Sequence, residues 1–255
     1  MPFLELARRI EYEWLGPAPG EAPSVVLLHH GLGSVSSWRD FPSAVADATG
    51  AGVLVYSRFG YGRSTPSSSF PWPVDFMHRA ARHELPELVA ALDMKRPLLV
   101  GHSDGASIAI LNAASDPVEE PSGLVLLAPH VFVEERTVQG ARDARVEYET
   151  GDLRTRLARH QDDPASAFEG WNQTWLRPEF RDWNIESSVA QIGCPTTVIQ
   201  GTEDEYGTLA QIDSIRAHCR AKLEIKLVSG GHAPHREHPD VVIEAIRDQL
   251  EYASV

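Results

Sequence analysis

The stretch Pro97-Leu98-Leu99-Val100-Gly101-His102-Ser103-Asp104-Gly105-Ala106 decides the fold of this chain. Its apolar run over 97–102 predicts a buried strand, and the spacing of apolar residues over 106–114 predicts a helix directly behind it. The G-x-S-x-G pattern over 101–105 falls between the two, and its glycines permit the sharp turn that holds a reactive serine at the end of a strand. A serine that only caps a helix in a glycine-rich turn is the alternative. Ser103 is therefore the candidate nucleophile.

Further apolar runs predict the rest of a sheet. Most are nearly continuous, as is typical of strands buried on both faces of a parallel sheet, and they lie at 25–30, 52–57, 123–128 and 196–200. Residues 223–228 alternate, which predicts a strand nearer the edge, and 10–14 predict an antiparallel edge strand. Helices are expected over 38–48, 74–92, 106–114, 209–219 and 239–252. Alternating strands and helices predict an α/β fold with right-handed crossovers.

One long interval interrupts this alternation. Residues 133–193 separate two predicted strands, carry many charges, and include Trp171, Trp175 and Trp183. Connections of this length in compact domains are usually functional or form a small subdomain. We expect a helical cap over 133–193, with 1–132 and 194–255 forming the core. The tryptophans either line a substrate pocket or form the small core of the cap itself.

A serine hydroxyl is a poor nucleophile until a base takes its proton. His232 follows the strand that ends at Val228, so a glycine-rich loop places it at the same edge of the sheet as Ser103. His235 and His238 are close in sequence. A metal site built from these three histidines is an alternative, but no helical histidine pair or carboxylate pattern supports it.

The third member of such a site is an acid that orients the imidazole. Asp204 follows the strand at 196–200 and lies at the same edge, flanked by the competing acids Glu203 and Glu205. The expected order along the chain is thus Ser103, Asp204, His232.

The remaining requirement is a pair of N–H donors for an oxyanion. His30-Gly31-Leu32-Gly33 follows the strand at 25–30, and its glycines let the backbone approach a ligand closely. We expect the N–H groups of Leu32 and Asp104 to be the donors. A plain strand-to-helix turn is the alternative explanation of these glycines.

Four motifs together resemble the α/β-hydrolase superfamily over essentially the whole chain. They are the segments 30–33, 59–64, 101–105 and 231–235. The resemblance implies a mostly parallel eight-stranded sheet with helices on both faces and a helical lid between strands six and seven. In relatives the base is the histidine directly after the glycine of the last motif, which here is His232 and not His235.

The chain also departs from the pattern of that superfamily. Ser57 stands where many members have an aspartate, with Arg58 next to it, and Asp104 follows the nucleophile where an apolar residue is more usual. A carboxylate beside Ser103 would repel an anionic substrate, unless it turns away or pairs with Arg58 or Arg63.

These residues favour a serine hydrolase that cleaves a small ester, thioester or lactone through an acyl-enzyme on Ser103, with no metal or organic cofactor. The resemblance also includes enol-lactonases and the carbon–carbon bond hydrolases of aromatic degradation. A non-catalytic ligand receptor on the same fold is an alternative of another class. Candidates for lining the substrate pocket are Trp171, Trp175, Tyr206 and Phe132.

Composition limits the partners. The formal net charge of −13 over 255 residues disfavours nucleic acid and anionic membrane surfaces. Two cysteines are too few for a disulfide framework, and no apolar run is long enough for a signal sequence or a membrane span. We therefore expect a soluble, cytoplasmic protein whose partner is a small-molecule substrate. The sequence is silent on oligomeric state, and a homodimer is kept as an option.

Overall fold

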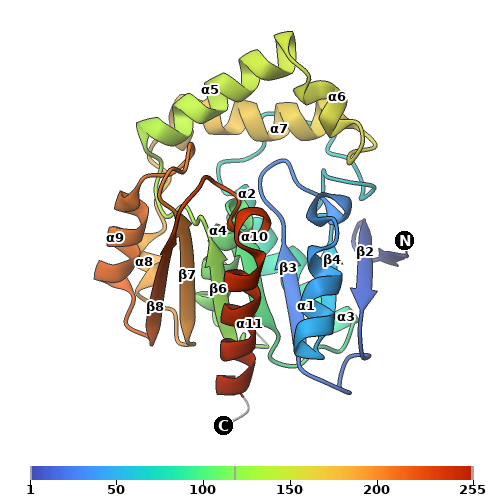
Figure 1. Ribbon diagram of the computed structural model, residues 1–255. Helices are drawn as coiled ribbons and strands as arrows, with labels where there is room; N and C mark the ends of the chain where they lie inside the picture. The colour runs from blue at the N-terminus through green and yellow to red at the C-terminus, as the bar shows by residue number, and fades with distance from the viewer. Residues whose placement is uncertain (1, 118, 254–255) are drawn as a thin grey trace.

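The computed structural model describes residues 2–117 and 119–253, so residues 1, 118 and 254–255 of the expected core lie outside it (Figure 1). A sheet with the strand order β1-β2-β4-β3-β5-β6-β7-β8 lies at its centre. The strands are β1 (Phe3–Glu5), β2 (Arg9–Leu15), β3 (Ser24–Leu28), β4 (Gly52–Tyr56), β5 (Leu98–His102), β6 (Gly123–Leu127), β7 (Thr196–Gly201) and β8 (Leu223–Val228). The two pairings of β2 are antiparallel and the other pairings are parallel, which confirms the expected α/β fold.

The expected strands are confirmed because burial follows their apolar content. All five residues of β3, β4, β5 and β6 are buried, whereas β8 alternates at the free edge of the sheet. Strand β1 was not predicted from its residues, because it contains only three residues and none of them is buried.

Helices cover both faces of the sheet, and alternate residues of each strand serve opposite faces. On β3, Val25 and Leu27 pack with α1 (Phe41–Thr49) and α11 (Pro239–Ala253), while Val26 and Leu28 face the other side. That other face carries α2 (Phe76–Arg79), a π-helical turn at Ala80–Glu84, α3 (Leu85–Ala91), α4 (Asp104–Ala113) and α9 (Leu209–His218). The short helix α10 (Pro234–Glu237) follows β8.

Between β6 and β7 the chain forms α5 (Glu135–Thr150), α6 (Leu153–Leu157), α7 (Pro164–Leu176) and α8 (Glu186–Val189). Figure 1 shows α5, α6 and α7 across the carboxyl end of the parallel strands, and α8 beside α9. Arg145 of α5 joins two of these helices, because its Nη1 and Nη2 groups each donate to the Glu169 carboxylate of α7 at 2.7 Å. We propose that 133–193 acts as the cap.

No helix in the described part of the chain is both long enough and apolar enough to cross a bilayer.

Candidate active site

Ser103 stands at the turn between β5 and α4 with φ 56° and ψ −119°, a left-handed conformation that costs a non-glycine residue free energy. The neighbouring glycines make this turn feasible. A Cβ at Gly105 would meet the carbonyl oxygen of Leu28, and a Cβ at Gly101 would meet the backbone of Gly105. The strain is thus imposed by close packing of α4 against β3 and β5, and it presents the serine hydroxyl at the carboxyl end of the sheet.

A continuous line of hydrogen-bonding groups lies at this edge and runs from Ser103 through His232 to Asp204. The Nε2 atom of His232 lies 2.9 Å from Oγ of Ser103, and its Nδ1 atom lies 2.7 Å from Oδ2 of Asp204. A carboxylate accepts hydrogen bonds, so this pattern assigns the imidazole proton to Nδ1 and leaves Nε2 free to accept from the hydroxyl. The imidazole of His232 can therefore take a proton from Ser103, and the resulting imidazolium is held beside the negative charge of Asp204.

The Asp204 carboxylate is buried and fully hydrogen-bonded. Besides His232 it accepts from the backbone N–H groups of Tyr206 at 2.7 Å and Gly207 at 3.0 Å, and from Nε2 of Gln200 at 2.8 Å. Burial by itself raises the pKa of Asp204, but hydrogen bonds from His232, Tyr206 and Gln200 outweigh it and lower the pKa to about 2. Asp204 is therefore ionised across the neutral range.

The two competing acids do not contact the imidazole ring. Glu203 and Glu205 are both exposed. Glu205 accepts only from the backbone N–H of His232, at 3.1 Å, so it supports the loop and not the ring.

The other two histidines of the loop have separate surroundings. His235 is 3% exposed and packs against Trp38, with ring centroids 4.8 Å apart. His238 lies near Ser229, with its Nε2 atom 2.7 Å from the carbonyl oxygen of that residue. Among the described residues no group of histidines, cysteines and carboxylates has a geometry that could hold a metal ion. The three-histidine metal alternative therefore has no geometric support.

The two expected oxyanion donors differ in whether their N–H group already has a hydrogen-bond acceptor. The Asp104 N–H, in the first turn of α4, has no acceptor within the described chain. The Leu32 N–H instead makes a long hydrogen bond of 3.3 Å to Nδ1 of His30. A bond of that length is weak, so a negatively charged oxygen can compete for this donor.

The loop that carries Leu32 is held by its His30 carbonyl. This oxygen accepts from the N–H of Gly33 and from Nη2 of Arg58, both at 3.0 Å, and it lies 2.7 Å from Nδ1 of His29. Nε2 of His29 accepts from the Arg58 N–H at 3.1 Å, which assigns the proton of His29 to Nδ1. Arg58 is thus a positioning residue for the loop.

Three of the four proposed lining residues lie close to this centre. The indole of Trp171 contacts Gly31, where a Cβ would meet its Nε1 atom. The ring of Tyr206 lies 4.8 Å from that of His232, and Trp175 lies 5.4 Å from His130. Trp175 also packs at 6.2 Å against Trp183, so it belongs to the core of the cap as well.

Phe132 is placed differently. It forms a bridge with Asn184, and its backbone groups bond to the side chain of Gln211, with the carbonyl accepting at 3.2 Å. Its half-buried ring packs on the core below the cap. The same apolar cluster includes Trp171 and Trp175, and the role of Phe132 in lining the pocket stays a prediction.

The Asp104 side chain is buried beside the nucleophile without a cationic partner. It is 1% exposed, and its Oδ2 atom makes no hydrogen bond with a described residue. Burial raises the pKa of Asp104 to about 6, against the opposing effects of Arg58 and His232. The hypothesis of an ion pair with Arg63 is wrong, because Arg63 lies near Asp162 and Glu11 instead, at 3.8 and 4.0 Å. Arg58 forms no ion pair with Asp104 among the described residues, and its positive charge lowers the pKa of Asp104 from a longer distance.

Ser57, which stands where many members of the superfamily have an aspartate, is hydrogen-bonded to a carboxylate from another strand. Oε2 of Glu11, on β2, accepts from the Ser57 hydroxyl at 2.7 Å and from the Arg63 N–H at 2.9 Å. The same hydroxyl accepts from the N–H of Val35 at 2.9 Å. Sequence reasoning missed Glu11, because only the pairing of β2 with β4 brings the two residues together.

Two histidines whose rings lie close to that of His232 were also not singled out from the sequence. Nε2 of His102 donates to the carbonyl of His232 at 2.6 Å and so fixes the loop of the proposed base. The ring of His130 lies 5.6 Å from that of His232. His130 follows β6 as Asp204 follows β7, so its position after a parallel strand was the signal that could have found it.

The chain belongs to the alpha/beta hydrolase family, whose sequence model matches residues 25–245. It is similar to the putative carbamate hydrolase RutD of Klebsiella pneumoniae, with 27% identity over 241 residues that cover 86% of this chain and 88% of that protein. It is also similar to the mouse (Mus musculus) serine hydrolase BPHL, with 27% identity over 78% of this chain and 69% of that protein.

Solved structures share the fold. The enol-lactonase from Burkholderia xenovorans LB400 superposes with a TM-score of 0.77 at 21% identity, covering 98% of this chain and 100% of that one. Family membership and these relatives support a hydrolase activity for this chain.

The histidines around the site make the fold sensitive to acid. Burial lowers the pKa of His130 and of His235 to about 3 and lowers that of His102 well below its ordinary value. Between pH 6.5 and 3 the unfolded chain therefore binds more protons than the folded one, and stability falls as pH falls. We expect His130 and His235 each to remove up to roughly 1.4 kcal/mol of unfolding free energy per pH unit in that window, with His102 acting in the same direction.

Urea titrations at pH 7.5, 6, 5 and 4 measure this slope. The His235→Phe variant keeps an apolar ring against Trp38 and is expected to show a shallower loss by the amount due to one histidine. An equal slope in both proteins would contradict the expectation.

Proposed function

We propose that this chain is a serine hydrolase that cleaves a small ester, thioester or lactone through an acyl-enzyme on Ser103. The observation that carries the proposal is the line from Ser103 to Asp204, with 2.9 Å on one side of the His232 ring and 2.7 Å on the other. A serine, an imidazole and a buried carboxylate in this geometry are the parts that acyl transfer requires.

In the first half of the proposed reaction, Oγ of Ser103 attacks the substrate carbonyl while its proton moves to Nε2 of His232. The carbonyl oxygen becomes an oxyanion, which the N–H groups of Asp104 and Leu32 bind. The imidazolium then gives its proton to the leaving oxygen or sulfur, the bond to that atom breaks, and the acyl group stays on Ser103. Asp204 keeps its charge and holds the ring throughout.

In the second half a water molecule attacks the acyl-enzyme. His232 takes a proton from this water and returns it to Oγ of Ser103 as the carboxylic acid leaves. Each half needs only groups of this chain, water and the substrate.

The surroundings favour a substrate whose acyl part is small and without negative charge. Trp171 and Trp175 offer apolar surface beside the site, and the buried Asp104 carboxyl, with its pKa at about 6, is largely ionised at pH 7.5. A negative group bound next to it would be repelled at low local dielectric.

A fluorophosphonate probe and a substrate panel test this proposal. We expect the probe to label the wild type at Ser103 and the panel to show turnover of short esters or lactones, with an enol-lactone and a vinylogous diketone as the rival substrates. Absence of both labelling and turnover would instead favour the ligand-receptor alternative.

A further inference from the structure

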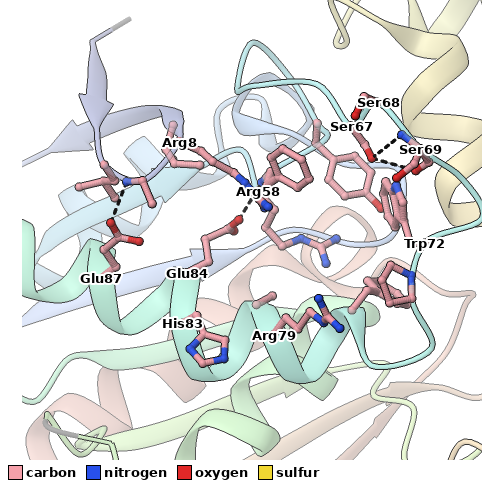
Figure 2. Close-up of a pocket in the computed structure, with 18 residues that line it drawn as sticks. Arg8, Arg58, Ser67, Ser68, Ser69, Trp72, Arg79, His83, Glu84 and Glu87 are labelled. Carbon is pink, nitrogen blue, oxygen red and sulfur yellow. Dashed lines mark hydrogen bonds between the residues drawn. The ribbon is translucent and has the colours of Figure 1, made fainter.

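A cavity of about 560 Å³ lies beside β2, with Leu6, Ile10 and Arg58 among the residues that line it. Segments from three parts of the chain surround it: the residues before β2, the loops after β4, and the helical stretch from α2 to α3 (Figure 2). None of the residues that line it is Ser103, Asp204, His232, Leu32 or Asp104. Its volume falls in the range of small-molecule sites.

The wall of this cavity contains a buried guanidinium without a carboxylate partner. Arg58 is 3% exposed and lines the cavity, and no carboxylate of the described residues lies within ion-pair distance of it. Its Nη2 and Nε atoms bond to neutral groups of His30 and His29, whereas Nη1 has no partner within the described ranges. The carboxylates of Glu84 and Asp104 attract this charge only from beyond ion-pair distance, so an anion in direct contact would stabilise the buried guanidinium further.

Each of the two acidic residues of the wall accepts one hydrogen bond from a backbone donor, although Oε1 of Glu84 is buried without a partner among the described residues. Oε2 of Glu84 accepts from the N–H of Phe59 at 2.9 Å, and Oε1 of Glu87 accepts from the N–H of Ala7 at 2.9 Å. Burial raises the pKa of Glu84, while the N–H of Phe59 and the positive charges of Arg58 and Arg8 act in the opposite direction. Three arginines, Arg8, Arg58 and Arg79, line the cavity beside two carboxylates, and this excess of positive charge favours an anion over a cation.

The rest of the wall is aromatic. Tyr61 and Trp72 are buried, with ring centroids 5.0 Å apart, and Phe59 and Phe76 complete the surface. Such a wall binds the flat or branched apolar body of a small molecule. Figure 2 shows the side chains of Arg58, Glu84, Arg79 and Trp72 around the same space.

We propose that this cavity is a binding site for an organic monocarboxylate, with its carboxylate on Arg58 and its aryl or branched alkyl body against Trp72 and Phe76. A guanidinium binds a carboxylate through charge-assisted hydrogen bonds, which a neutral or cationic head group of the same shape cannot form. The site shares Arg58 with the loop that carries Leu32, but Ser103, Asp204 and His232 do not line it, and binding there needs neither labelling nor turnover at Ser103.

Three probes of one shape test the site by calorimetry on the Ser103→Ala variant: phenylacetate, 2-phenylethanol and 2-phenylethylammonium. We expect phenylacetate to bind with one-to-one stoichiometry and at least about tenfold more tightly than either of the others, since hydrogen bonds to charged groups are the strong ones. Equal affinity for the acid and the alcohol, or a preference for the ammonium, would overturn the assignment.

Variants locate the probe. Ala80 lines the cavity without a polar contact, so Ala80→Leu is expected to reduce phenylacetate affinity about tenfold or more by filling space while Arg58 is retained. Arg58→Gln should weaken binding to the level of the alcohol. The matched control is Arg82→Gln, which should leave the affinity unchanged, because Arg82 is exposed on the same helical stretch and does not line the cavity. Unchanged affinity in Ala80→Leu would place the probe elsewhere and refute the proposal.

Discussion

Ser103→Ala is expected to lower turnover of p-nitrophenyl acetate by about 10⁴-fold or more, with the fold retained. The substitution removes only the oxygen that attacks the carbonyl. The backbone N–H of Asp104 and the line between His232 and Asp204 do not depend on it. Alanine suffers the same strain at φ 56° as serine, so the unfolding free energy should change little.

The matched control is Ser107→Ala on the same helix. Ser107 is also buried, but its hydroxyl donates to the carbonyl of His130 at 2.6 Å and does not contact the line. We expect this variant to lose about 1 kcal/mol of stability and to keep turnover within about tenfold of the wild type. Ser103→Gly adds a structural readout, because relief of the left-handed strain should make it about 1 kcal/mol more stable than Ser103→Ala. Wild-type turnover in Ser103→Ala would remove the serine mechanism.

Much of the fold followed from local patterns. The buried strands β3 to β7 are nearly continuous apolar runs, and the glycines at 101 and 105 predicted a turn that packing then enforces. The positions after strand ends also predicted that Ser103, Asp204 and His232 lie close together, because parallel strands share one carboxyl edge.

What could not be predicted depends on contacts between distant segments. Glu11 reaches the Ser57 hydroxyl only because β2 pairs with β4, and Arg58 supports the loop of Leu32 through a carbonyl that no spacing rule identifies. The environment of Asp104 is another such case, since burial and the field of Arg58 arise from packing and not from neighbours in sequence. The bonds between the backbone of Phe132 and the side chain of Gln211 are a further case, since the two residues are far apart in sequence.

His232→Ala is expected to lower kcat by about 10⁴-fold or more, whereas His235→Ala should retain substantial activity. His232 is the imidazole that contacts both the Ser103 hydroxyl and the Asp204 carboxylate. Without it the hydroxyl has no acceptor for its proton, although the N–H of Asp104 is still in place.

His235→Ala provides the matched control, three residues away on the same segment. His235 is 3% exposed and packs on Trp38 and Phe41, so its loss leaves a cavity and costs stability on the order of 2–4 kcal/mol. Activity is therefore compared at a temperature well below the unfolding transition of both variants. Because burial lowers the pKa of His235 to about 3, its ring is neutral at assay pH and adds no charge to the site. A nearly inactive His235→Ala beside an active His232→Ala would show that the base lies at 235 and that the line from Ser103 to Asp204 does not carry the proton.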